Sequence, residues 1–375
     1  MSLLYFTLLT FFISAAIGYL AIPRIVVIAK VKRLFDQPDA RKVHSGSIPR
    51  LGGISFFPGA MFSFAFVLGL RYYLGYELSL AREGNLMVEF LFMISGMLML
   101  FFIGLTDDLV GVGYRTKFIV QVYAGTALLL SGLGIDSLQG FLGVVDLPIW
   151  ISGFLTVLVV VFVINAFNLI DGVDGLCSGL GAIILTVLGA WYIVLGEFVY
   201  SMFAFGMVGV VVVFFQYNIR GNRMKIFMGD TGSLTLGYMI IFLGLKFISI
   251  DTNTYPDAYQ IHSSIALLFG LMFVPVFDTF RVFISRISRG KSPFYPDKTH
   301  IHHKLLAMGF THLQNTAILL ITEVAIFGLT IVMSEVLEFN VNIVIVVLCA
   351  IGVFANMMIN KRIAKISLSK QDKNV

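Results

Sequence analysis

Residues 155–195 read LTVLVVVFVINAFNLIDGVDGLCSGLGAIILTVLGAWYIVL, with a long apolar run on either side of a polar centre. The centre carries four polar side chains spaced three residues apart, Asn165, Asn168, Asp171 and Asp174. Similar apolar runs recur along all 375 residues, of which 58% are hydrophobic and only 13% charged. Soluble proteins carry about 25% charged residues. The sequence therefore predicts an all-α polytopic membrane protein, because a barrel would show short alternating segments instead.

The apolar runs predict eleven membrane spans, and an odd number places the two termini on opposite sides of the membrane. No basic residue precedes the first apolar run, which favours an uncleaved first span over a signal peptide. The predicted spans cover residues 2–22, 51–70, 88–106, 117–134, 149–169, 176–195, 199–217, 233–250, 263–280, 314–336 and 341–360.

The distribution of basic residues orients these spans. Of the 26 Lys and Arg residues, all but Arg71, Arg82 and Lys246 fall in alternate inter-span segments and the C-terminal tail. Basic segments stay in the cytoplasm, so we expect the N-terminus outside and the C-terminus cytoplasmic. We predict one transmembrane catalytic domain over residues 1–360 and a basic cytoplasmic tail over 361–375. The cytoplasmic loops are predicted at about 23–50, 107–117, 218–230 and 281–313.

This orientation brings the conspicuous polar clusters to one membrane face. Each cluster begins, ends or joins spans on the side predicted to be cytoplasmic. The clusters are RKVHSGSIPRLGG (41–53), TDDLVG (106–111), NAFNLIDGVDGL (165–176), FMGDTGS (227–233), FDTFR (277–281) and KTHIHHKLL (298–306). The two cysteines, Cys177 and Cys349, are far apart in sequence and predict neither a disulfide framework nor a metal site.

Asp107 and Asp108 are adjacent carboxylates at the predicted end of a span. Two carboxylates this close resist ionising together unless a cation lies near them. The negative end of the helix dipole is also a poor place for acids. We therefore interpret the pair as facing magnesium or accepting a proton. The alternative is an acidic helix terminus at the lipid headgroups.

The four polar residues of the opening segment form a strip, because residues three apart are neighbours on a helix. Carboxylate and amide oxygens suit Mg²⁺, which binds one or two carboxylates together with substrate phosphates. The alternative is a seam between helices, since amide and small residues also join membrane helices. Two acids, Asp171 and Asp174, at that depth favour the functional interpretation.

Asp230 lies between two glycines at the predicted start of a span, where free backbone N–H groups form an anion site. Capping of the helix by Thr231 or Ser233 is the plainer interpretation, and both can hold together. We predict Asp230 as a magnesium ligand. Phe227 is a candidate to stack on a nucleotide base, or else a member of an interfacial aromatic belt.

Basic side chains and histidines accompany the carboxylates in two loops. The last long loop carries His300, His302 and His303 between Lys298 and Lys304, which suits diphosphate binding better than a zinc site without cysteines. A solvated loop is the third possibility. In the first loop, Arg41, Lys42, His44 and Arg50 precede Gly52-Gly53 and either contact phosphate or serve only membrane orientation. Asp278 either supports the same face or pairs with Arg281, one helical turn later.

Together these residues supply the parts needed for phosphoryl transfer at a membrane surface. Carboxylates hold a divalent ion, cations hold phosphate oxygens, and the site opens onto lipid. A cation-coupled transporter is the alternative, although transporters use acids near the membrane midplane and often internal repeats, and no repeat is visible here. A non-enzymatic scaffold has little support beyond glycine-rich spans.

Residues 36–312 resemble the polyprenyl-phosphate N-acetylhexosamine-1-phosphate transferase superfamily, glycosyltransferase family 4. The resemblance rests on NAFNLIDGVDGL, FMGDTGSLTLG and HIHHKLLAMGFTH in this order, together with the Asp pair. The undecaprenyl-phosphate N-acetylglucosamine-1-phosphate transferase branch looks most similar. The branch that uses UDP-N-acetylmuramoyl-pentapeptide tends to have three consecutive histidines and a Lys three residues after the Asp pair, where this chain has Gly111.

The resemblance implies that undecaprenyl phosphate attacks the sugar-linked phosphorus of a UDP-N-acetylhexosamine, UDP-GlcNAc in first place, with release of UMP. It further implies Mg²⁺, with Mn²⁺ as a substitute, a homodimer, no nucleic-acid partner, and a place on the cytoplasmic face of the bacterial inner membrane. The pathway would be cell-wall or lipopolysaccharide biosynthesis.

The resemblance also implies roles for individual residues. The residues matched to catalysis are Asp107, Asp108, Asp171, Asp174 and His302. Substrate contacts are implied for Lys42, His44, Asn168, Phe227, His300 and His303, and for Lys117, which with Arg115 is a candidate for the basic role missing at Gly111. The implied metal ligands are Asp230 and Asp171. Whether Asp171 and Asp174 bind metal or hold uridine stays open.

Overall fold

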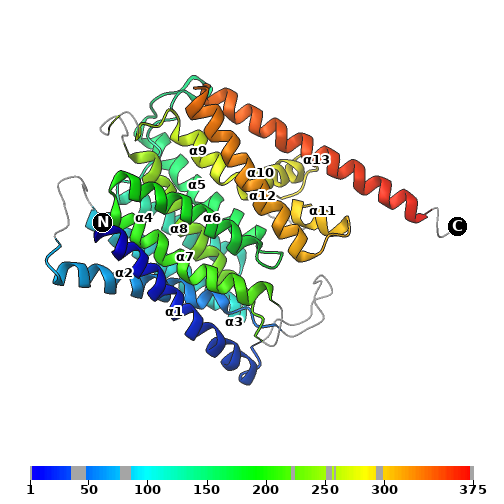
Figure 1. Ribbon diagram of the computed structural model, residues 1–375. Coiled ribbons are helices and arrows are strands. Elements are labelled where there is room, and N and C mark those ends of the chain that lie inside the picture. The colour runs from blue at the N-terminus through cyan, green and yellow to red at the C-terminus, as the bar shows by residue number, and fades with distance from the viewer. Residues whose placement is uncertain are drawn as a thin grey trace. The chain divides into compact units, whose positions relative to one another are not determined.

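The computed structural model describes residues 2–34, 48–76, 86–220, 224–250, 256, 259–292 and 299–371. Regular structure in these residues is helical, as predicted (Figure 1). The α-helices are α1 (Ser2–Val31), α2 (Phe56–Tyr73), α3 (Leu86–Val110), α4 (Tyr114–Leu130), α5 (Ile149–Ile170), α6 (Leu176–Leu195), α7 (Phe198–Ile219), α8 (Gly229–Ser249), α9 (Ser264–Leu271), α10 (Phe273–Ile287), α11 (Ile301–Ala307), α12 (His312–Ile331) and α13 (Val341–Gln371).

All eleven predicted spans coincide with helical segments, but the ninth is not one helix. Helices α9 and α10 meet at Met272 with a bend of 82°. Helix α4 has only 17 residues, fewer than the roughly 20 that cross a bilayer. In the described residues, nine helices are long and apolar enough to span a membrane, or ten if the bent pair is one span. The count of eleven and the orientation therefore stay predictions.

The chain divides into two compact units, which are described separately. The first unit comprises residues 1–136, 148–171 and 177–260, and the second comprises 137–147, 172–176 and 261–375. The prediction of one catalytic domain over residues 1–360 stays a prediction. Helix α13 continues past the predicted end of its span at residue 360 to Gln371, so much of the basic tail is helical.

Helix α8 is the core of the first unit. In its most apolar window 89% of the residues are buried, and α8 packs against α3 and α5. Helix α7 packs against α1 and α2 in the same unit. A helix that is apolar on all sides belongs in the interior of a bundle, and α8 therefore offers a fixed platform for the polar residues at its N-terminus.

The N-terminus of α8 is held by very close backbone packing. The short 3₁₀ turn η1 (Gly52–Ser55) lies against it, and a Cβ added at Gly53 would stand 2.1 Å from Gly232 Cα. Gly53 N–H donates to Met228 O at 2.9 Å. The Gly52-Gly53 pair therefore has a structural role, because only glycine permits this approach.

A buried ion pair joins the opposite end of α8 to α3. Lys246 Nζ lies 3.0 Å from Glu89 Oε1, and Tyr200 of α7 donates to Glu89 Oε2 at 2.5 Å. The Lys246 ammonium also lies 4.6 Å from the centroid of the Tyr200 ring, a cation–π arrangement. Lys246 was one of three basic residues outside the predicted cytoplasmic segments, and Glu89 compensates its charge.

The second unit is built on α12. Helices α9, α10 and α11 each pack against α12, and α13 packs against α9 and α11. Helix α12 begins with a capping box in which Thr311 and Gln314 each bond the backbone of the other, a strong start signal for a helix. This arrangement places the histidine-rich α11 beside the N-terminal turns of α12.

Candidate active site

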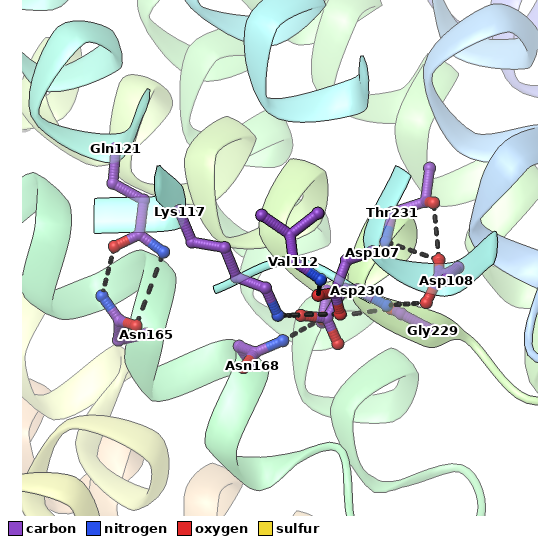
Figure 2. A network of polar contacts seen from close by, with 11 residues as sticks. Asp107, Asp108, Val112, Lys117, Gln121, Asn165, Asn168, Gly229, Asp230 and Thr231 are labelled. Atoms are coloured by element: carbon purple, nitrogen blue, oxygen red, sulfur yellow. Dashed lines mark hydrogen bonds and ion pairs between the residues drawn. The ribbon is translucent and has the colours of Figure 1, made fainter. Parts of the chain in front are cut away.

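Asp107 lies in the last turn of α3, where the chain reverses. Gly111 follows with a φ of +77°, and its N–H donates to Asp107 O at 2.9 Å, which ends the helix in the left-handed conformation that glycine adopts readily. Val112 N–H then donates to Asp107 Oδ1 at 2.7 Å. The turn therefore fixes this carboxylate and leaves Oδ2 directed at Lys117 (Figure 2).

Asp108 caps the N-terminus of α8 from another helix. Its Oδ1 accepts from Asp230 N–H at 2.7 Å, and its Oδ2 accepts from the Thr231 N–H at 2.9 Å and the Thr231 hydroxyl at 2.6 Å (Figure 2). A carboxylate at a helix N-terminus is stabilised by orphan N–H groups and by the dipole. We expected capping by Thr231 or Ser233 and N–H groups free for an anion. The cap is instead Asp108, which uses the N–H groups of residues 230 and 231.

Gly229 is the residue that permits this cap. Its φ is +74°, and an added Cβ would lie 2.6 Å from both Asp108 carboxylate oxygens and 2.1 Å from Arg50 O. Any side chain at this position would push Asp108 away from α8. The glycines around Asp230 in FMGDTGS thus hold a backbone geometry.

Lys117 bridges two carboxylates at the centre of the site. Its Nζ lies 2.8 Å from Asp107 Oδ2 and 2.5 Å from Asp230 Oδ2. Asp107, Asp108 and Asp230 each offer a carboxylate oxygen, and these oxygens lie within 4.8 Å of one another. Three hard oxygen donors at this spacing are the ligand chemistry that Mg²⁺ prefers, so the residues present fit a divalent ion.

Amide side chains on two successive turns of α5 make contacts near this cluster. Asn168 donates to Ser233 Oγ at 2.9 Å, which ties α5 to the first turn of α8. One helical turn away, Asn165 donates to Gln121 Oε1 at 2.6 Å (Figure 2). It also donates to Val161 O at 2.7 Å. Because Gln121 follows Lys117 by one turn of α4, this pair fixes the helix that delivers the lysine.

A polar cavity opens beside the carboxylates. It has a volume of about 140 Å³ and is lined by Leu34, Arg50, Leu51, Asp107, Asp108, Leu109 and Gly111. This volume is below the roughly 300–1,000 Å³ of complete small-molecule sites, so it suits a fragment the size of a phosphate group. Among the described residues of this lining, Arg50 is the basic one.

Phe227 is bonded to the segment that leads into η1. Its N–H donates to Pro49 O at 2.8 Å, its carbonyl accepts from Gly52 N–H at 2.9 Å, and Lys225 Nζ lies 5.6 Å from its ring centroid. Base stacking by Phe227 stays a prediction.

A second polar cluster lies in the second unit, around Asp278. Arg281 Nη2 lies 2.6 Å from Asp278 Oδ1, and His300 Nδ1 lies 2.9 Å from Asp278 Oδ2. Ile301 N–H donates to both carboxylate oxygens, at 3.1 and 3.2 Å. Asp278 thus pairs with Arg281 and holds the start of α11. His300 is 4% exposed, and its ring contacts Asp278 within this cluster. Its contact with phosphate stays a prediction.

His302 is the most enclosed residue of the histidine cluster, which comprises His300, His302 and His303. It is 1% exposed, its ring centroid lies 4.3 Å from that of His303, and a Cβ added at Gly172 would stand 2.7 Å from its Nε2. Burial and the neighbouring His303 lower the pKa of His302 to about 3. None of the described residues bonds its Nδ1. At this pKa the His302 ring is neutral at pH 7, and its catalytic role stays a prediction.

Asp174 is held by the start of α12. His312 Nδ1 lies 3.6 Å from Asp174 Oδ2, and the Thr316 hydroxyl donates to Asp174 O at 2.7 Å. Asp171 ends α5 and belongs to the first unit, but it is not a member of the carboxylate group that could hold a metal. The roles proposed for these two acids stay predictions.

Two partners of the polar residues were not predicted from the sequence. Gln121 bonds Asn165, and His312 lies beside Asp174. Ser233, considered from sequence only as a helix cap, bonds Asn168. The signals were present: Gln121 lies one turn after Lys117, and His312 closes the quoted HIHHKLLAMGFTH motif. Lys42 and His44 lie outside the described residues.

Comparison with known proteins identifies relatives over most of the chain. Residues 90–248 match the family model for glycosyl transferase family 4. The undecaprenyl-phosphate alpha-N-acetylglucosaminyl 1-phosphate transferase of Escherichia coli strain K12 is 32% identical over 346 residues, which cover 91% of this chain and 87% of the relative.

Two further relatives come from other bacteria. The protein of the same description from Yersinia pestis is 32% identical over 78% of this chain and 74% of its own length. A probable undecaprenyl-phosphate N-acetylglucosaminyl 1-phosphate transferase of Bacillus subtilis strain 168 is 32% identical over 76% of this chain and 73% of its own length. No match of the cation-coupled transporter class is among these relatives, and that alternative has no support.

Proposed function

This chain belongs to glycosyl transferase family 4, and from that premise we propose that it transfers GlcNAc 1-phosphate from UDP-GlcNAc to undecaprenyl phosphate, releasing UMP. The observation that carries the proposal is the cluster of Asp107, Asp108 and Asp230 around Lys117. These residues join the end of α3 to the start of α8, inside the region that matches the family model. The relatives named above are described as transferases to undecaprenyl phosphate.

We propose that Asp107, Asp108 and Asp230 hold Mg²⁺, or Mn²⁺ in its place. When bound, such an ion neutralises the charge that develops on transferring phosphoryl oxygens. The protein's own contribution is positional: Asp108 fixes the first turn of α8, and that turn fixes Asp230. A preorganised site of this kind avoids reorganisation during the reaction.

We propose that Asp107 receives or positions the proton of the acceptor phosphate, because among the described residues its Oδ2 is bonded by the Lys117 ammonium alone. Lys117 then supplies positive charge to a substrate phosphate. Arg50, in the same cavity, is placed to hold a second phosphate oxygen. Asn168 and Phe227 are the residues we assign to the nucleotide. The role of Asp174 stays a separate prediction.

We propose that this site faces the cytoplasm of the bacterial inner membrane. Support comes from the charge asymmetry, since 107–117 and 218–230 are among the basic segments predicted to lie there. Cytoplasmic UDP-sugars would then reach the site from water, and undecaprenyl phosphate would reach it from the lipid. The homodimer implied by the family remains a proposal, which chemical crosslinking in native membranes would test.

The deciding experiment offers a panel of UDP-sugars to the purified protein with undecaprenyl phosphate and Mg²⁺, and measures UMP release and lipid-linked product. We expect UDP-GlcNAc to give the highest kcat/KM. Absence of lipid-linked product with every UDP-N-acetylhexosamine would overturn the proposal. A preference for another UDP-N-acetylhexosamine would overturn only the choice of sugar.

The metal assignment has its own test with a matched control. Asp230→Asn should reduce turnover by roughly 10²–10³-fold, the size of loss seen when one preorganised electrostatic group is removed. Asp146→Asn makes the same chemical change at an exposed carboxylate and should leave turnover intact. Titration with Mn²⁺ followed by electron paramagnetic resonance reports binding independently of turnover, and unchanged Mn²⁺ affinity in Asp230→Asn would move the site elsewhere.

A further inference from the structure

Glu323 is a fully buried carboxyl in the middle of α12, in a helix apolar enough to span the membrane. Ionisable residues inside membrane helices are costly and usually carry a function. No residue of the carboxylate cluster or of the histidine cluster contacts Glu323 among the described contacts. Its presence therefore needs another explanation.

The contact that Glu323 makes lies at the break between α9 and α10. Val274 N–H donates to Glu323 Oε2 at 2.8 Å, and Phe273 N–H is also directed at this carboxyl. Met272, the residue at the break, has φ −113° and ψ 24° and offers no side-chain cap to α10. Glu323 supplies the cap that the chain lacks locally.

The first turn of α10 needs this cap because a helix N-terminus leaves backbone N–H groups without partners. Pro275 has no N–H group, and Val276 N–H already donates to Met272 O at 3.1 Å. Phe273 and Val274 therefore carry the two remaining donors, and both face Glu323. An unsatisfied backbone group inside a membrane costs several kcal/mol, so the break is stable only with an acceptor there.

Helix α10 transmits this anchoring to the histidine cluster. Asp278 follows Val274 by about one turn, and it holds His300 and the N–H of Ile301. Any tilt of the N-terminus of α10 would move Asp278, and with it the start of α11. Close packing limits other adjustments: a Cβ added at Gly270, just before the break, would lie 2.2 Å from Thr330 Oγ1 of α12.

We propose that Glu323 is a positioning residue that caps the broken helix and thereby sets the place of His300 and α11. The inference rests on the proposed transferase function for its catalytic consequence, but its structural part is independent of that function. Its acceptor role does not require ionisation, because a neutral amide oxygen can accept the same bond. None of the described residues bonds Glu323 Oε1. In Glu323→Gln the NH₂ group can therefore take the place of Oε1 without facing another hydrogen-bond donor.

This distinction gives a matched pair of variants. Glu323→Gln keeps an acceptor for Val274, whereas Glu323→Leu has similar volume and none. Hydrogen exchange measured by mass spectrometry on the full-length protein in detergent should show roughly tenfold faster exchange in Glu323→Leu at residues 273–274 and at 299–303. Glu323→Gln should exchange like the wild type. Glu338→Leu, at an exposed carboxylate, should also match the wild type.

Transfer kinetics supply the second readout. We expect kcat/KM to fall about tenfold in Glu323→Leu, as for the loss of one buried hydrogen bond, and to stay within twofold of wild type in Glu323→Gln. Wild-type exchange and kinetics in Glu323→Leu would overturn the inference, as would equal damage in both variants. If the wild type shows no transfer, the proposed function fails, and the exchange data alone still decide the role of Glu323.

Discussion

Asp108→Asn is the substitution that most directly separates a reacting carboxylate from a positioning one. Asp108 accepts three hydrogen bonds from the first turn of α8, at 2.7, 2.9 and 2.6 Å. An asparagine has one acceptor oxygen, so it can keep either the Asp230 bond or the two Thr231 bonds. In the better orientation its NH₂ group faces the Asp230 N–H, donor against donor.

The expected loss follows from that count. A hydrogen bond to a charged group contributes roughly 1.5–3 kcal/mol, and the variant loses at least one, so we expect destabilisation of about 2–3 kcal/mol. Asp107→Asn is the matched control. Asp107 lies on the same turn and is partly exposed. The amide oxygen of the substituted asparagine can still accept from Val112 N–H. That variant should cost no more than about 1 kcal/mol, because exposed ion pairs contribute little.

The assay is reversible unfolding in mixed micelles of detergent and SDS, paired with turnover of UDP-GlcNAc. We expect Asp108→Asn to lower both stability and turnover, because Asp230 loses its fixed position. Asp107→Asn should lower turnover with little effect on stability. If Asp108→Asn unfolds at the wild-type SDS fraction while turnover is lost, Asp108 acts on substrate directly and the capping argument is wrong.

Three further predictions follow from other contacts. Lys117→Met should reduce turnover at least tenfold and raise Mn²⁺ affinity, since a cation that competes for Asp107 and Asp230 is removed; unchanged affinity would contradict this. Glu89→Ala should cost about 3–5 kcal/mol by leaving Lys246 buried without its partner, whereas replacing both by leucine should cost much less in the same unfolding assay. His302 has a pKa of about 3 in the folded state and an ordinary value of 6.5. Between these values the unfolded chain binds one more proton than the folded chain, so stability should fall as pH drops from 6.5 towards 3. The melting midpoint of His302→Asn should depend less on acid pH than that of the wild type.

The sequence alone determined the class of protein and the identity of the polar residues that matter. Apolar length and low charge content predict membrane helices without any knowledge of contacts, because the bilayer requires each span to satisfy its own backbone. The order of the motifs indicated the family, and the comparisons confirmed it. The Asp pair, Asp230 and Lys117 were all named from sequence and lie in one cluster.

Tertiary structure decided what those residues do to one another. Local pattern offered Thr231 or Ser233 as a possible cap for α8, whereas the cap comes from Asp108, more than a hundred residues away in sequence. The bend between α9 and α10 was equally invisible, because the apolar run is continuous and the stabilising acceptor, Glu323, lies in another helix. A helix terminus accepts any suitable oxygen that the fold brings near, and sequence spacing records only the oxygens on the same segment.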